Sequence, residues 1–156
     1  MTPGIEITET ELKFTEFSSK EIGLAKYCKS FNLKLNEIKL IGISPRLALD
    51  DESIFILIID KSKRIYPIPD HIIGTKGLQE FENYFKLSSI QKEWERFEHE
   101  DHYGKMDKVI YPKEQYWNDL FEKDWKLRIR TLYSWIQPKS FYGNLNKKNV
   151  SDSLNR

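Results

Sequence analysis

The residues best suited to chemistry lie between positions 95 and 102, where acidic side chains surround His99 and His102. These histidines are three positions apart, so on a helix they would lie on one side and could share a metal ion that activates water. A metal centre also needs a third ligand and ordered supporting hydrogen bonds, and neither occurs at a recognisable spacing. We therefore expect a solvated helix end without a metal, and a metal-dependent hydrolase is our second alternative. The candidate ligands are Glu95, Glu98, His99, Glu100, Asp101 and His102.

Two further patterns could support catalysis, and both lack a necessary part. Asp70 and His71 could form a base at a strand end, but no nucleophile motif or glycine-rich loop accompanies them. Asp70 could also join Asp124 and Lys126 in a metal-nuclease pattern, but the predicted helix would turn Asp124 and Lys126 to different sides. We predict no catalytic residues and no cofactor.

Basic and aromatic residues alternate near the end of a predicted helix at 113–136, which suggests a nucleic-acid contact. Against this, the whole chain has 25 basic and 24 acidic residues, and cations in the last turns of a helix also complement its dipole. Nucleic-acid binding is therefore the first alternative. The residues concerned are Lys123, Lys126, Arg128, Arg130, Tyr133, Trp135 and Lys139.

Aromatic residues exceed what a small core requires, with eight tyrosines and four tryptophans. Several tyrosines fall in predicted loops or off the apolar stripes, and these residue types are enriched at protein interfaces. We therefore predict a non-enzymatic protein-binding domain, an immunity or antitoxin-type inhibitor or an adaptor that blocks a partner protein. The predicted contact residues are Tyr103, Tyr111, Tyr116, Arg128, Arg130 and Tyr133.

The element that must position all of these residues is an uninterrupted apolar run at 54–59, IFILII. A short run without alternation is typical of a strand that is covered on both faces. Strand-like segments at 12–17, 37–43 and 64–68 predict a small antiparallel sheet of about four strands, mostly within residues 12–68. Pro67 and Pro69 place the last of these strands at an edge.

Helical patterns supply the predicted cover. A capping box at Ser18 and Glu21 opens a helix at 19–31 on one face, and helices at 78–85, from Ser88 onward and at 113–136 cover the other. Residues 101–112 are a predicted break between helices. The expected fold is α+β, with a single domain over 1–142 and a flexible tail over 143–156.

Cysteine content and hydropathy bear on location. The chain has one cysteine, Cys28, and shows neither a secretory leader nor an apolar stretch of membrane-spanning length. We therefore predict a cytoplasmic protein that does not associate with membranes.

Overall fold

The apolar run lies in β5 (Asp51–Asp60), an inner strand of a four-stranded antiparallel sheet. The computed structural model describes residues 4–15, 29–48, 51–69, 75–90, 92–93, 107–115, 119–122 and 145–155. In this central sheet the order is β6-β5-β4-β7, so β6 lies at an edge as predicted. The other three strands are β4 (Ile38–Ala48), β6 (Ile65–Pro69) and β7 (Lys108–Tyr111).

Both faces of β5 are buried, which confirms the double cover predicted for the run. Each of the side chains from Phe55 to Ile59 is at most 1% exposed. Successive side chains of a strand point to opposite faces, so Leu57 and Ile58 belong to different sides of the sheet. On the Leu57 side, the β5 register places Gly42 directly opposite. A Cβ at Gly42 would lie 3.5 Å from Leu120 Cδ1, so the segment around Leu120 covers this face.

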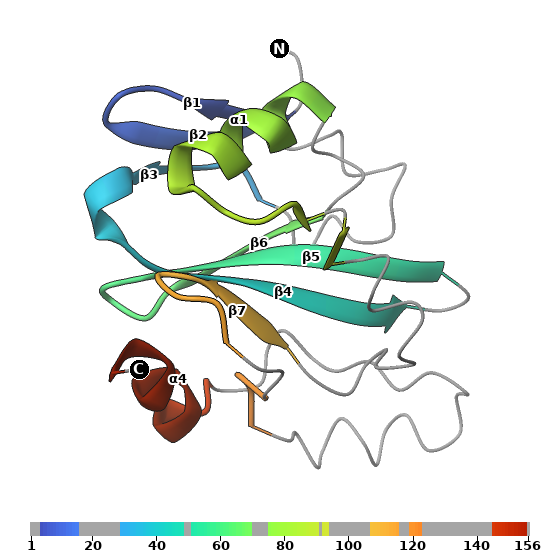
Figure 1. Ribbon diagram of the computed structural model, residues 1–156, viewed down its shortest axis with the longest axis vertical. Coiled ribbons are helices and arrows are strands. Elements are labelled where there is room, and N and C mark those ends of the chain that lie inside the picture. The colour runs from blue at the N-terminus through green and yellow to red at the C-terminus, as the bar shows by residue number, and fades with distance from the viewer. Residues whose placement is uncertain are drawn as a thin grey trace.

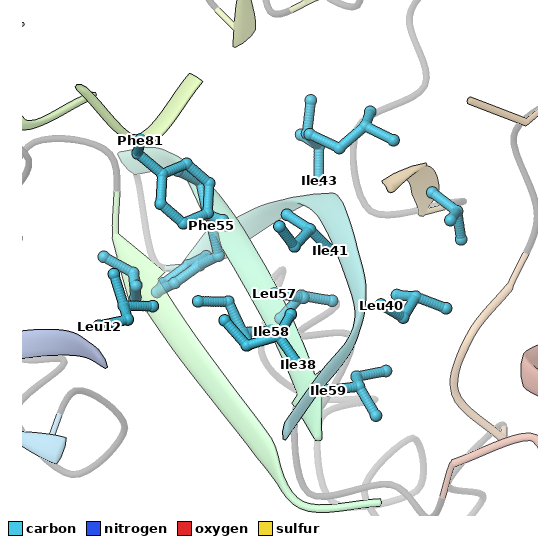
Figure 2. Packing of buried hydrophobic residues seen from close by; sticks show 14 of the residues in the cluster. Leu12, Ile38, Leu40, Ile41, Ile43, Phe55, Leu57, Ile58, Ile59 and Phe81 are labelled. Carbon is cyan, nitrogen blue, oxygen red and sulfur yellow. The ribbon is translucent and has the colours of Figure 1, made fainter. Parts of the chain in front are cut away.

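The Ile58 side is covered by a second antiparallel sheet rather than by a helical layer alone. Tyr66 of β6 pairs with Ile58, and its ring packs on Phe31 with centroids 4.8 Å apart. Phe31 begins an outer strand of the three-stranded N-terminal sheet, whose order is β1-β2-β3. Its strands are β1 (Gly4–Ile7), β2 (Glu11–Thr15) and β3 (Phe31–Lys34). Figure 2 shows Leu12 of β2 among the buried side chains of β4 and β5.

Mixed α and β structure with antiparallel strands is confirmed, but the prediction of one sheet is wrong. The predicted first strand at 12–17 corresponds to β2, which pairs with β1 and β3 instead of joining the central sheet. The physical reason is that β1 and β3 are only four residues long, so their local patterns are weak, and β3 pairs with a strand far from it in sequence. Phe31, predicted as the end of a helix, is instead the first residue of β3. The rest of the predicted helix 19–31 lies outside the described residues, apart from 29–30, which are irregular.

Helix α1 (Thr75–Phe85) covers β1 and confirms the helix predicted at 78–85. Its central side chain, Phe81, is fully buried in the core that both sheets share. Gly77 permits the close approach, because a Cβ there would lie 3.2 Å from the carbonyl oxygen of Ile5. In Figure 1 the N-terminal sheet and α1 lie at one end of the molecule, with β7 and α4 toward the other.

The prediction of a long helix at 113–136 is wrong over the part that the structure describes. Residues 113–115 and 119–122 are not helical, and Phe121 forms a β-bridge with Leu145. The predicted break at 101–112 contains β7, which pairs Lys108 with Ile43 of β4. Pairing with β4 therefore overrides a local pattern that favours a loop. Residues 123–136 lie outside the described ranges.

A helix begins near the predicted capping box, one residue later than expected. Ile90, Lys92 and Glu93 are helical, and Ser89 rather than Ser88 accepts the hydrogen bond from the Lys92 amide through its Oγ, at 3.4 Å.

Where the sequence predicts a flexible tail at 143–156, the structure has helix α4 (Lys147–Asn155). Asn146 begins it, because its Oδ1 accepts a hydrogen bond from the Asn149 amide at 3.1 Å. The Asn146 amide also donates to Leu120 O at 2.9 Å, and Val150 is 5% exposed. Asn149 Nδ2 also donates to Asp119 O at 2.6 Å, and Gln115 Nε2 donates to Ser153 O, so several hydrogen bonds to the 115–120 region hold this polar segment in place.

The turn predicted at 61–63 joins β5 to β6 and depends on Asp60. Asp60 Oδ1 accepts a hydrogen bond from the Arg64 amide at 2.9 Å, and Asp60 Oδ2 accepts one from the Tyr66 hydroxyl at 2.9 Å. Lys63 has φ 64°, the left-handed conformation that a type I turn followed by a bulge requires. Partial burial, together with the hydrogen bond to Asp60, raises the pKa of the Tyr66 phenol above its usual 10.0.

This raised pKa predicts how stability depends on alkaline pH. The protonated phenol contributes stability that is fully present below pH 10.0, the unfolded value, and is lost as pH rises through the folded pKa. We expect the wild-type protein to lose stability above that pH more steeply than Tyr66→Phe, which has no hydroxyl to titrate. Urea unfolding of both proteins at neutral and alkaline pH measures the difference; equal losses would contradict the prediction.

Candidate functional site

Of the six predicted contact residues, the structure describes only Tyr111. It is half-buried at the end of β7, and its ring meets Phe85 edge-on at a centroid distance of 5.3 Å. The other five contact residues, the histidine cluster and the nuclease-like and basic helix residues lie outside the described ranges.

A shallow groove of about 380 Å³ lies near Tyr84, at the end of α1. Three segments that are distant in sequence form it: the β1–β2 turn, the junction of β3 with the 3-10 helix η1 (Leu35–Glu37), and the last turn of α1. We call it the α1 groove. Its lining consists of Glu9, Thr10, Glu11, Lys34, Leu35, Asn36 and Tyr84.

Hydrogen bonds hold the first two walls of the α1 groove together. In the β1–β2 turn, Thr8 Oγ1 accepts from the Glu11 amide at 3.0 Å, and the Thr8 amide donates to Glu11 O at 2.9 Å. The Leu35 amide then donates to Thr10 O at 2.9 Å, which ties η1 to the turn. The side chain of Leu35 is itself buried. These walls are therefore ordered before any ligand arrives.

Tyr84 provides the third wall and is 46% exposed. Its ring meets Phe85 edge-on at 5.0 Å and 69°. Phe85 in turn contacts Phe81 at 5.0 Å and Tyr111 at 5.3 Å. Tyr84, Phe85 and Tyr111 form an aromatic row that begins at the groove and ends at β7. An exposed ring is thus fixed by rings that belong to the core or its margin.

The C-terminus of α1 fixes the backbone beside Tyr84. Lys86 has φ 53°, and the Leu87 amide donates to Glu82 O at 2.9 Å while the Lys86 amide donates to Asn83 O at 3.3 Å. This is the Schellman arrangement, in which a left-handed residue closes the helix.

The lining of the α1 groove contains two carboxylates, those of Glu9 and Glu11, and one ammonium group, that of Lys34. The β2–β3 register places Glu11 opposite Lys34, and Asn32 Nδ2 donates to Glu11 Oε2 at 3.1 Å. Glu9 is exposed on the turn. The groove therefore combines an aromatic face with an acidic surround, which suits contact with a partner.

Buried polar side chains elsewhere hold β7 in place. Asp107 is 1% exposed and accepts from Ser44 Oγ and, at 3.0 Å, from the Leu120 amide. Ser44 is fully buried, so its hydroxyl is closed to a substrate. This pair therefore joins β4, β7 and the Leu120 segment as a structural contact.

Lys108 forms a second buried polar contact, on the other side of β7. Its Nζ pairs with Glu93 Oε2 and, at 2.9 Å, with Glu114 Oε1. The side chains of Lys108 and Glu93 are each 6% exposed, whereas that of Glu114 is 50% exposed. The ion pair therefore links β7 to the helical turn at Glu93.

The described residues contain neither a metal-binding group nor a helix that could span a membrane. They contain no cluster of three or more histidine, cysteine, aspartate or glutamate side chains placed to hold a metal ion. No helix in these segments is long and apolar enough to cross a bilayer.

Tyr84 was missed by the sequence analysis, although a signal for it exists. Leu78, Phe81 and Phe85 form the apolar stripe of α1, and Tyr84 stands beside Phe85 at the margin of that stripe. A large aromatic residue just off a stripe can be partly exposed and still be held by its neighbour. That signal identifies the Tyr84 side chain. It does not identify the groove, because the groove is formed by the pairing of β2 with β3.

No family model, curated protein or solved structure matches the chain.

Proposed function

We propose that the chain is a protein-binding domain that acts by contact, with the α1 groove as part of its binding surface. The observation that carries this proposal is the exposed ring of Tyr84, fixed against Phe85 in a groove with ordered walls. Binding loses less conformational entropy when the contacting side chains are already held in place. Tyrosine is also among the residues that most often dominate binding energy.

Such a domain would inhibit by covering the working surface of its partner, as an immunity or antitoxin-type inhibitor does, or would link two proteins as an adaptor. The aromatic row extends the proposed surface from Tyr84 toward Tyr111, the predicted contact residue that the structure describes. The polar groups of the groove would supply the rim that steers and orients the partner. A single cysteine without a disulfide partner favours action in a reducing compartment such as the cytoplasm.

Affinity capture from the native source tests the proposal with a matched set of variants. Tyr84→Ala removes the ring, Tyr84→Phe removes only the hydroxyl, and Lys147→Ala changes an exposed residue of α4 at the other end of the molecule (Figure 1). We expect one stoichiometric partner with the wild type, Tyr84→Phe and Lys147→Ala, and its loss with Tyr84→Ala. With purified partner, Tyr84→Ala should weaken binding about 10-fold or more.

Two results would contradict the proposal. Full recovery of the partner by Tyr84→Ala would remove the α1 groove from the binding surface. Absence of any stoichiometric partner with the wild type would remove the protein-binding function itself. Far-ultraviolet circular dichroism of each variant separates loss of binding from loss of folding.

A further inference from the structure

We propose that the α1 groove receives an arginine side chain of the partner protein, stacked on Tyr84 and paired with Glu9. This inference rests on the proposed function and specifies the chemistry of the partner at the same site. It is carried by the coincidence of an exposed aromatic face and an excess of carboxylates in one ordered groove.

Glu9 is the carboxylate best placed to pair with an incoming cation. Glu11 already accepts from Asn32 and lies opposite Lys34. Glu9, in contrast, makes no hydrogen bond or ion pair within the described parts of the chain, and its side chain is exposed. Thr8 and the backbone hold the turn that carries it, so Glu9 can pair with a ligand without a change of fold.

The charge of the groove selects a cation over an anion. Glu9 and Glu11 line it together with a single ammonium group, that of Lys34. A cation over the face of a tyrosine ring is attracted by its negative quadrupole. Arginine fits better than lysine, because its planar guanidinium can stack on a ring while its edge binds a carboxylate.

The positive charge of Lys34 allows a test of whether the ligand of the groove is a cation. Its ammonium group lines the same groove and repels an incoming cation, so Lys34→Gln should strengthen binding of an arginine ligand, whereas Glu9→Gln should weaken it. If Glu9 and Lys34 only supported the fold, their substitutions would not change ligand binding in opposite directions.

The experiment is a selection from a phage library of random linear peptides. The library is first depleted on Tyr84→Ala protein and then selected on the wild type. We expect arginine to be enriched over its frequency in the starting library. Selected peptides should bind Tyr84→Ala about 10-fold or more weakly than the wild type, and Glu9→Gln about 2- to 5-fold more weakly. They should bind Lys34→Gln more tightly, and replacement of their arginine by neutral citrulline should abolish the dependence on Glu9.

Each contrary outcome overturns the inference. A selected pool without arginine enrichment, no peptide surviving the depletion, or equal binding of the arginine and citrulline peptides would each do so. The proposed function is judged separately, by whether Tyr84→Ala loses the native partner. Loss of that partner with a failed selection would leave a protein-binding groove that uses other chemistry.

Discussion

Lys108→Met is expected to lower the free energy of unfolding by about 3–5 kcal/mol, as is typical when one member of a buried ion pair is removed. The Lys108 and Glu93 side chains are each 6% exposed, so the substitution removes an ammonium group from a carboxylate that has little access to water. Glu114 is half exposed and can be solvated. The cost therefore arises mainly at Glu93. Urea unfolding followed by tryptophan fluorescence measures it.

A double variant separates the loss of the charge pair from the loss of packing. In Lys108→Met/Glu93→Leu both charges are replaced by apolar groups, so no buried carboxylate has lost its ammonium group, and most of the lost stability should return. Lys92→Met is the matched control, because this neighbouring lysine is exposed and should change stability by no more than about 0.5 kcal/mol. If the double variant were as unstable as Lys108→Met, the buried Glu93 charge would not be the cause.

Leu57→Ala and Ile58→Ala should each cost about 2–5 kcal/mol, the usual range for emptying a packed core position. The two side chains are fully buried on opposite faces of β5. A strand covered on one face would show a large cost at only one of the two positions. Similar losses at both are therefore the specific consequence of cover by the N-terminal sheet on one side and by the Leu120 segment on the other.

Chemical denaturation of the two variants and of Lys13→Ala checks this expectation. Lys13 is exposed on β2, so its replacement should have little effect. A small loss at Ile58 together with a large loss at Leu57 would show that the N-terminal sheet packs only weakly on the central sheet.

The prediction for Ile58→Ala also bears on the proposed binding surface. The N-terminal sheet carries two walls of the α1 groove, and α1 carries the third. If the sheet packed weakly on the core, the walls would not be ordered in advance, and the entropic advantage argued for Tyr84 would be lost. Ile58→Ala should therefore weaken partner binding as well as stability, whereas Lys13→Ala should change neither.

Local sequence patterns were sufficient to predict the elements whose signal is contained in one short segment. The run at 54–59 indicated a doubly buried strand because it contains no polar position that could face water. The turn at 61–63 and the helix at 78–85 were likewise predicted, from turn residues between two strands and from helical spacing. Each of these signals is contained in a short segment, so the residues alone are enough.

Elements that exist because of a distant partner could not be predicted in this way. β7 contains Lys108 and follows a polar segment, so it resembles a loop until its pairing with β4 and the contact with Glu93 are known. β3 is four residues long and becomes a strand through β2, which lies well before it in the chain; β1 is equally short, and its weak local pattern becomes a strand only by pairing with the adjacent β2. For such short strands, the hydrogen bonds and burial gained on pairing outweigh weak local preferences.

The same distinction holds for the site. An excess of tyrosine and tryptophan is visible in the composition, but the composition does not show which aromatic ring is exposed. The α1 groove joins positions 9–11, 34–36 and 84, which meet because Glu11 pairs with Lys34 and because α1 packs on β1. Residue types therefore set the available chemistry, whereas strand register and helix packing set its location, since both depend on contacts between segments far apart in the chain.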